Sequence, residues 1–204
     1  MIKVEQKFIL TKEDIERLTA GAEFLNERTF KDAYYDTTEF ALTRNDMWLR
    51  KRGEEFELKI PMHLEGNKTG QQYQKIEGAE KIREIFAVAP IGSFEDDIAA
   101  FDYAPFCECV TIRRKFRVGS FVIDLDEIEY GDFSYCIGEI ELMVNEKSEI
   151  SNAINKIEAF AGDNLLTIAP VRGKVIEYLK RKKDPADAWG PFAFLLLFSE
   201  CVKN

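Results

Sequence analysis

The chain opens with Ile2-Lys3-Val4-Glu5-Gln6-Lys7-Phe8, a stretch in which charged and uncharged side chains alternate. Successive side chains of a β-strand point to opposite faces, so Lys3, Glu5 and Lys7 would line one face of a strand. Apolar residues would back the other face as core. The same alternation returns in most of the chain. The sequence therefore predicts a sheet with a polar interior face, whose desolvated charges would require an ionic ligand.

Composition limits the classes of protein that the chain can belong to. It has 204 residues, 46% of them hydrophobic, which is enough for a globular protein with a substantial core. A formal net charge of −9 argues against nucleic acid as the main partner. Four cysteines are too few for a disulfide scaffold, and a single histidine argues against a cysteine–histidine metal site. The first residues lack an apolar signal core, and the longest apolar stretch, residues 191–198, is too short for a bilayer, so we expect a cytoplasmic protein without a membrane partner.

Strand-like segments dominate the chain and short polar turns such as Gly53-Glu54 join several of them. Eight strands are predicted, at about residues 2–8, 28–36, 47–52, 55–61, 71–77, 107–118, 121–129 and 135–145. Helices are expected at about residues 11–20, 79–88, 93–101, 151–161 and 173–183. An even number of antiparallel strands can close into a barrel. The predicted fold class is α+β, an eight-stranded antiparallel β-barrel with helices packed outside, formed by residues 1–183 as one domain and followed by an apolar tail at 184–204.

Basic and acidic side chains segregate by strand. The basic pairs are Arg50/Arg52 and Arg113/Arg117, and the acidic pairs are Asp124/Asp126 and Glu139/Glu141. A solvated outer face is the alternative explanation, because antiparallel sheets commonly present one polar face to water. Arginine and lysine suit phosphate oxygens, however, and clustered carboxylates bind Mg²⁺ or Mn²⁺, which bridge phosphates. The pattern thus indicates a site for a polyphosphate chain and a metal ion.

Several short motifs are each weak evidence alone, but their order and spacing together are specific. They are Val4–Phe8, Asp32–Thr37, Trp48–Arg52, Glu57–Lys59, Thr111–Arg113, Asp124–Asp126, Gly138–Glu141, and Ala169–Pro170 leading to Lys174. Over residues 2–183 the chain resembles the CYTH superfamily, and within it the thiamine triphosphatases. The resemblance implies an antiparallel triphosphate tunnel that binds a small-molecule triphosphate and Mg²⁺, with Mn²⁺ as the alternative metal.

The resemblance also implies a role for each residue that matches a family motif. The residues implied to hold the triphosphate are Lys7, Arg50, Arg52, Lys59, Arg113 and Lys174. Those implied to hold the metal are Glu5, Asp124, Glu139 and Glu141, with Asp126 as a weaker candidate. Tyr34 and Lys59 would pair to activate the attacking water. Trp48 would pack on the thiamine moiety, with core packing as the alternative for this residue.

Two lysines depart from the family pattern. The family opens with Glu-x-Glu-x-Lys, where this chain has Lys3 in place of the first glutamate, and Lys75 stands where another glutamate is expected. Three explanations stay open. The metal site is rebuilt around the remaining acids, or the lysines contact phosphate directly and replace one metal, or the chain binds polyphosphate but hydrolyses it poorly.

The expected activity is metal-dependent removal of the terminal phosphate of thiamine triphosphate by a protein that is expected to be a monomer. One alternative is an inorganic tripolyphosphatase, and another is a catalytically weakened polyphosphate-binding module. An adenylyl cyclase is disfavoured because the sequence has no distinct base-recognition signature. We further expect that Arg52→Ala weakens triphosphate binding without unfolding the protein.

Overall fold

The computed structural model describes residues 2–61, 73–167 and 171–182, and in them it confirms eight antiparallel strands in one sheet. The strands are β1 (Ile2–Phe8), β2 (Glu23–Asp36), β3 (Trp48–Arg52), β4 (Glu55–Pro61), β5 (Tyr73–Glu77), β6 (Ala104–Val118), β7 (Phe121–Glu129) and β8 (Ser134–Val144). The helices are α1 (Lys12–Thr19), α2 (Ala79–Phe86), α3 (Phe94–Ala99), α4 (Ile150–Asp163) and α5 (Lys174–Lys182). The predicted α+β class is therefore confirmed, while the predicted tail at 184–204 lies outside the described residues.

The strand order is β1-β8-β7-β6-β2-β3-β4-β5, so the first and last strands in the sequence are neighbours in the sheet. β2 begins five residues earlier than predicted and β6 three residues earlier. The added residues of both strands are largely exposed, so they carry no apolar alternation that a sequence pattern could detect.

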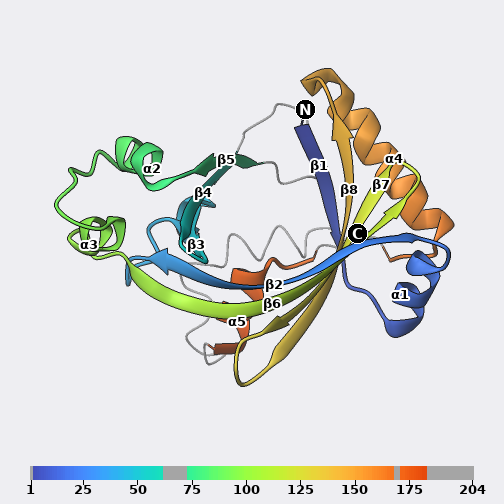
Figure 1. Ribbon diagram of the computed structural model, residues 1–204, viewed down its shortest axis with the longest axis horizontal. Helices are drawn as coiled ribbons and strands as arrows, with labels where there is room; N and C mark the ends of the chain where they lie inside the picture. Colours follow the sequence, from blue (N-terminus) through green and yellow to red (C-terminus); the bar gives the residue numbers. More distant parts are fainter. Residues whose placement is uncertain (1, 62–72, 168–170, 183–204) are drawn as a thin grey trace, which may run out of the picture. The chain divides into compact units, whose positions relative to one another are not determined.

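Two compact units make up the described chain. The first contains residues 2–29 and Thr111–Lys174, and the second contains Phe30–Val110 with the described residues from Val175 onward. In the first unit, α4 lies against β1 and β8 (Figure 1). Its buried residues Ile150 and Ile157 cover the sheet face on which Val4 and Ile140 are buried.

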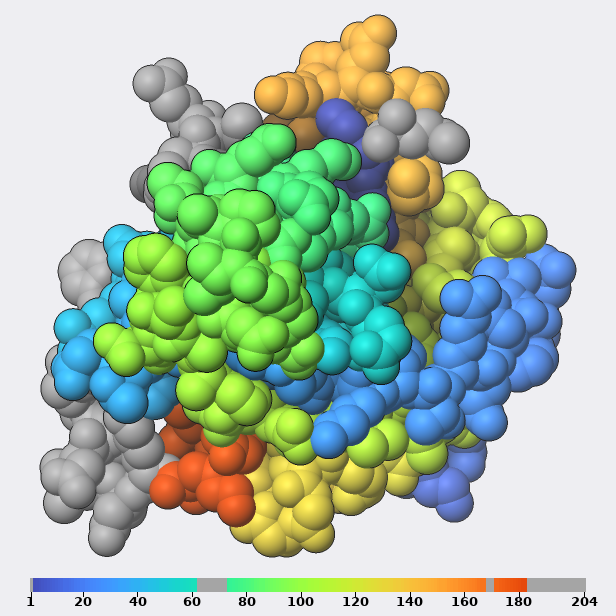
Figure 2. All heavy atoms as spheres, turned by 60° about the vertical axis from the view of Figure 1, so that its left-hand side comes forward, coloured from blue at the N-terminus to red at the C-terminus, as the bar shows by residue number. Residues whose placement is uncertain are grey.

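The second unit has its own core on one face of β3 and β4. Leu49, Phe56 and Leu58 pack with Ile82 of α2 and Phe94 of α3. The rings of Phe56 and Phe94 meet edge to face with centroids 4.7 Å apart. Figure 2 shows the green atoms of α2 and α3 in front of the cyan atoms of β3 and β4. Because each unit buries one apolar sheet face, the alternating charges of its strands share the opposite face.

Side-chain caps fix two of the helix starts. Thr11 caps α1 and forms a capping box with Asp14, and Ser93 forms the same motif with Asp96 at α3. Of the helices that the structure describes, none has the length and apolar character needed to cross a membrane.

Candidate functional site

The charged face of the first unit is assembled by the register of β1, β7 and β8. Glu5 lies opposite Glu141 and Lys7 opposite Glu139 in the β1–β8 pairing, while Asp124 lies opposite Glu139 in the β7–β8 pairing. Charged residues from three strands therefore converge on one side of the sheet. The sequence predicted a charged face for each strand separately, but the pattern did not show which residues of the three strands meet.

Three of the four predicted metal ligands lie together. The carboxylates of Glu5, Glu139 and Glu141 offer oxygen atoms that all lie within 4.8 Å of one another. We call these three residues the carboxylate triad. An all-oxygen anionic donor set suits Mg²⁺ or Mn²⁺ and does not suit softer metals. The fourth predicted ligand, Asp124, is fully buried and has Arg113 Nη1 at 2.5 Å from its Oδ2.

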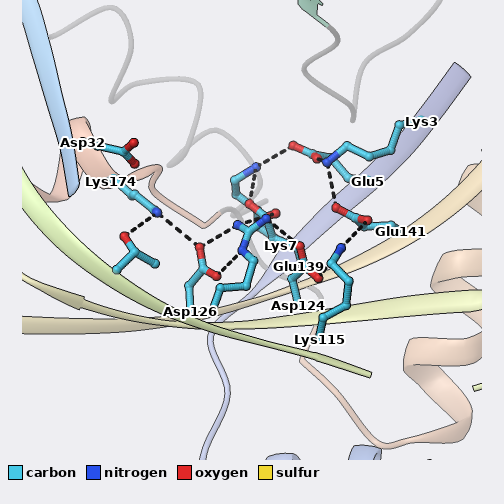
Figure 3. A network of polar contacts seen from close by, with 12 residues as sticks. Lys3, Glu5, Lys7, Asp32, Lys115, Asp124, Asp126, Glu139, Glu141 and Lys174 are labelled. Carbon is cyan, nitrogen blue, oxygen red and sulfur yellow. Dashed lines mark hydrogen bonds and ion pairs between the residues drawn. The ribbon is translucent and has the colours of Figure 1, made fainter. Parts of the chain in front are cut away.

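Two lysines of β1 link the triad (Figure 3). Lys3 forms ion pairs with Glu5 and, at 2.7 Å, with Glu141 Oε1. Lys7 Nζ lies 3.0 Å from Glu5 Oε1 and 3.2 Å from Glu139 Oε1. Burial favours the neutral carboxyl of Glu139, but the cations Lys7 and Arg113 outweigh it and lower the pKa of Glu139. Glu139 is therefore ionised, and ion pairs with internal cations hold the triad.

Arg113 and Lys174, two of the predicted triphosphate ligands, meet at Asp126. Arg113 Nε and Nη2 donate to the two oxygens of Asp126 at 2.5 and 2.7 Å. Lys174 Nζ lies 3.2 Å from Asp126 Oδ2 and donates to Thr111 Oγ1 at 2.8 Å. The predicted weaker ligand Asp126 is thus the partner of two cations, a role that the sequence did not indicate.

A second charged face lies in the second unit, on the side of β2–β5 opposite its core. The strand register aligns Tyr34, Arg50, Glu57 and Glu77 in one row across β2, β3, β4 and β5. Arg50 Nε donates to Glu57 Oε2 at 2.8 Å. Lys75, the second departure from the family pattern, lies with Nζ 3.0 Å from Glu57 Oε1 and also pairs with Glu77.

The two predicted catalytic residues occupy this second face but not the same row. Tyr34 lies opposite Arg50 on β3, whereas Lys59 lies opposite Trp48, two residues before Arg50 on that strand. Tyr34 is buried, and burial raises the pKa of its phenol well above the ordinary value. The phenol therefore keeps its proton at neutral pH and can donate a hydrogen bond.

Trp48 lies on the charged face rather than in the apolar core of its unit. Its indole Nε1 donates to Asp46 Oδ1 at 3.1 Å, and Tyr73 Oη donates to the same oxygen at 2.8 Å. The ring is partly exposed. Fixed by Asp46, the indole offers a flat surface beside Lys59, its cross-strand partner.

Asp36 is a positioning residue that the sequence analysis missed. Its carboxylate accepts hydrogen bonds from the backbone N–H groups of Thr37, Leu42 and Thr43 at 2.8–2.9 Å, and from Thr43 Oγ1 at 2.6 Å. These bonds pin the connection that leads to Trp48. The signal was available, because Asp36 lies two residues beyond Tyr34 on the same strand face.

Arg52 has a structural partner that changes the expected effect of its removal. Its Nε and Nη2 donate to both oxygens of Asp32 at 2.6 and 2.7 Å, and Asp32 is fully buried. Arg52→Ala is therefore expected to lower the free energy of unfolding by about 2–4 kcal/mol, in addition to weakening triphosphate binding, because it leaves a buried carboxylate without its main cation. This expected stability loss qualifies the sequence-based expectation for Arg52→Ala. Chemical denaturation and calorimetric titration with tripolyphosphate measure the two effects, and unchanged stability would contradict the structural role.

The contribution of Glu57 to stability is expected to depend on pH. Burial opposes its ionisation, but Arg50 and Lys75 prevail and lower the pKa of Glu57. A carboxylate whose pKa is lower in the folded than in the unfolded protein stabilises the fold at any pH above its unfolded-state pKa. This stabilisation is lost as the pH falls through the folded-state pKa. Glu57→Gln should be about 1–3 kcal/mol less stable than wild type at pH 7. This difference should shrink as the pH falls below about 4.5, the ordinary value. Urea unfolding of both proteins between pH 7 and pH 3 checks this, and a constant difference would contradict it.

Comparisons with known proteins agree with this architecture. Residues 1–166 match the CYTH domain. The thiamine-triphosphatase of Macaca fascicularis is 31% identical over 205 residues, which cover 89% of this chain and 85% of that protein. The human thiamine-triphosphatase is 29% identical over 200 residues, with the same coverage. A solved structure from Pyrococcus horikoshii OT3 shares the fold with a TM-score of 0.63 at 22% identity, over 89% of this chain and all of the other. The chain therefore belongs to the CYTH domain family.

Proposed function

We propose that the protein is a metal-dependent phosphohydrolase that converts thiamine triphosphate to thiamine diphosphate and phosphate. The observation that carries the proposal is the carboxylate triad, three carboxylates interleaved with lysine and arginine side chains on one sheet face. Such a set can hold a divalent cation and the phosphate oxygens that the cation bridges. Curated relatives with the name thiamine-triphosphatase, at about 30% identity over most of the chain, support the choice of substrate.

We assign Mg²⁺ or Mn²⁺ to the triad of Glu5, Glu139 and Glu141. When bound, the metal would polarise the phosphoryl group and neutralise its developing charge. The residues that we assign to the triphosphate are Lys7, Arg50, Arg52, Lys59, Arg113 and Lys174. Arginine can hold phosphate oxygens in a bidentate manner and lysine as a point charge.

The water that attacks the terminal phosphorus is assigned to Tyr34 and Lys59. Because the Tyr34 phenol keeps its proton, we infer that it orients the water by a hydrogen bond. The role of proton acceptor then falls to Lys59, which lies opposite the cationic Lys75 in the β4–β5 pairing. A Lys59→Met variant that loses much more turnover than triphosphate affinity would support this division of roles.

Phosphate release from thiamine triphosphate, tripolyphosphate and ATP, with and without Mg²⁺, tests the proposal. Rapid Mg²⁺-dependent turnover of thiamine triphosphate alone is the expected result. Preference for tripolyphosphate would make the protein an inorganic tripolyphosphatase. If no substrate is turned over but tripolyphosphate still raises the melting temperature, the protein is a polyphosphate-binding module and the proposal fails.

Trp48→Ala separates the organic substrate from the inorganic one. We expect kcat/KM for thiamine triphosphate to fall about 5- to 30-fold, because the variant loses the contact between the indole face and a cationic ring. Turnover of tripolyphosphate, which has no ring, should change less than twofold. Trp48→Phe, which keeps an aromatic face, is the matched control and should retain most activity. Equal losses for both substrates would show that Trp48 acts on the fold and not on thiamine.

A further inference from the structure

Every carboxylate oxygen of the triad already has a cationic partner within the first unit. The two oxygens of Glu5 face Lys3 and Lys7. The remaining oxygen–cation pairs are Glu141 Oε1 with Lys3, Glu141 Oε2 with Lys115, Glu139 Oε1 with Lys7, and Glu139 Oε2 with Arg113. A divalent cation that enters the triad must therefore displace at least one ammonium or guanidinium group.

The charges of this network balance without a metal. Five cationic and five anionic side chains take part in the ion pairs described for this face, which leaves no net formal charge. They are Lys3, Lys7, Arg113, Lys115 and Lys174 with Glu5, Asp124, Asp126, Glu139 and Glu141. A glutamate at position 3 would leave a net charge of −2, the amount that one divalent cation neutralises.

Lys3 is the cation best placed to leave. Its side chain is 43% exposed, against 30% for Lys7, 26% for Lys115 and 19% for Arg113. A partly exposed ammonium on a flexible stem can reach water at small cost, whereas the more buried groups would leave carboxylates without a partner. The position of its Nζ, at 2.7 Å from Glu141 Oε1, nevertheless keeps a positive charge at the triad in the absence of metal.

We propose that Lys3 is a resident cation that competes with the divalent metal for Glu5 and Glu141. Its ammonium offsets part of the negative charge of the triad when no metal is bound and must move away from Glu5 and Glu141 when one binds. The consequence is a weaker affinity for the metal than the three carboxylates would have alone, because like charges repel strongly at short range in a partly buried site. The inference rests on the proposed metal-dependent function, since it assigns the metal to the same triad.

Direct measurement of Mn²⁺ binding tests this competition in the absence of substrate. Free aqueous Mn²⁺ is followed by electron paramagnetic resonance, and binding heat by calorimetry, for wild type, Lys3→Met and Lys3→Glu. We expect the Kd for Mn²⁺ to fall about tenfold in Lys3→Met and further in Lys3→Glu. The matched controls are the same two substitutions at Lys12, an exposed lysine of α1, and these should change Kd less than twofold.

Several outcomes would overturn the inference. Kd values within twofold of wild type in both Lys3 variants would do so, as would absence of Mn²⁺ binding in all three proteins. If Lys3→Met leaves Kd unchanged but weakens binding of tripolyphosphate in EDTA, then Lys3 is a phosphate ligand instead. Circular dichroism checks that each variant is folded. If Lys3→Glu does not fold, the Kd of Lys3→Met alone decides the test. A wild type that turns over none of the triphosphates defeats the proposed function, while the Mn²⁺ comparison remains a separate test of Lys3.

Discussion

Glu139→Gln is expected to lower kcat/KM for triphosphate hydrolysis by about 100-fold or more while the protein stays folded. Glu139 links the carboxylate triad to two of the proposed triphosphate ligands, because its oxygens lie 3.2 Å from Lys7 Nζ and 3.3 Å from Arg113 Nη2. An amide of the same shape preserves packing but supplies a neutral, weaker metal ligand. It also removes the charge that orients two of the proposed triphosphate ligands.

The measurement is steady-state phosphate release from thiamine triphosphate across a range of Mg²⁺ concentrations. Glu16→Gln, at an exposed position of α1, makes the same change of charge in the same unit and should leave the rate unchanged. Recovery of wild-type activity at high Mg²⁺ would limit the role of Glu139 to metal affinity. A loss of less than fivefold at every Mg²⁺ concentration would remove Glu139 from the site.

Arg113→Met is expected to lower the free energy of unfolding by about 3–5 kcal/mol, the largest stability effect that we predict. Its guanidinium pairs with Asp124 and Asp126, and both carboxylates are buried. Arg113 and Lys174 hold the pKa of Asp126 below its ordinary value despite burial. Without the guanidinium, each buried aspartate would keep one cationic partner in place of two, Lys115 at 2.6 Å for Asp124 and Lys174 at 3.2 Å for Asp126.

Urea unfolding at pH 7 measures this loss. Arg117→Met is the control, because Arg117 is half exposed and pairs with Glu23 at 3.5 Å, so it should cost at most about 1 kcal/mol. Adding Asp126→Asn to Arg113→Met should recover part of the stability, since it removes one of the two buried charges that lost a cationic partner. A loss below 1 kcal/mol in the single variant would show that Lys115 and Lys174 suffice for the two aspartates.

The sequence predicted the strands better than the contacts between them. Alternation in residues 2–8 defines a strand and its charged face without any knowledge of neighbours. The bond from Lys3 to Glu141 joins positions 138 residues apart, so it depends on a strand register that no local pattern encodes. Lys3 could be recognised as a departure from the family, but its two partners could not.

The sequence also did not indicate which buried carboxylates pair with the predicted cations. Asp32 and Glu57 carry no assigned role in the predicted site, yet each is buried and holds an arginine at hydrogen-bonding distance. A usable signal exists, because Asp32 lies two residues before Tyr34 and Glu57 two residues before Lys59. An acid two residues from a predicted site residue lies on the same strand face. In a desolvated site such an acid is expected to form an ion pair with a neighbouring cation.

The pairing of β1 with β8 has a consequence for how the protein is made. β1 cannot find its partner until about 138 further residues have been synthesised, since Lys3 and Glu141 are 138 positions apart. At translation rates of roughly 5–20 residues per second, the nascent β1 waits about 7 to 28 s with Val4 and Phe8 uncovered. During that interval Lys3, Glu5 and Lys7 protect an unpaired strand from aggregation, because interspersed charges oppose edge-to-edge association. The charges of the proposed site thus also serve the nascent chain as solubilising groups before any active site exists.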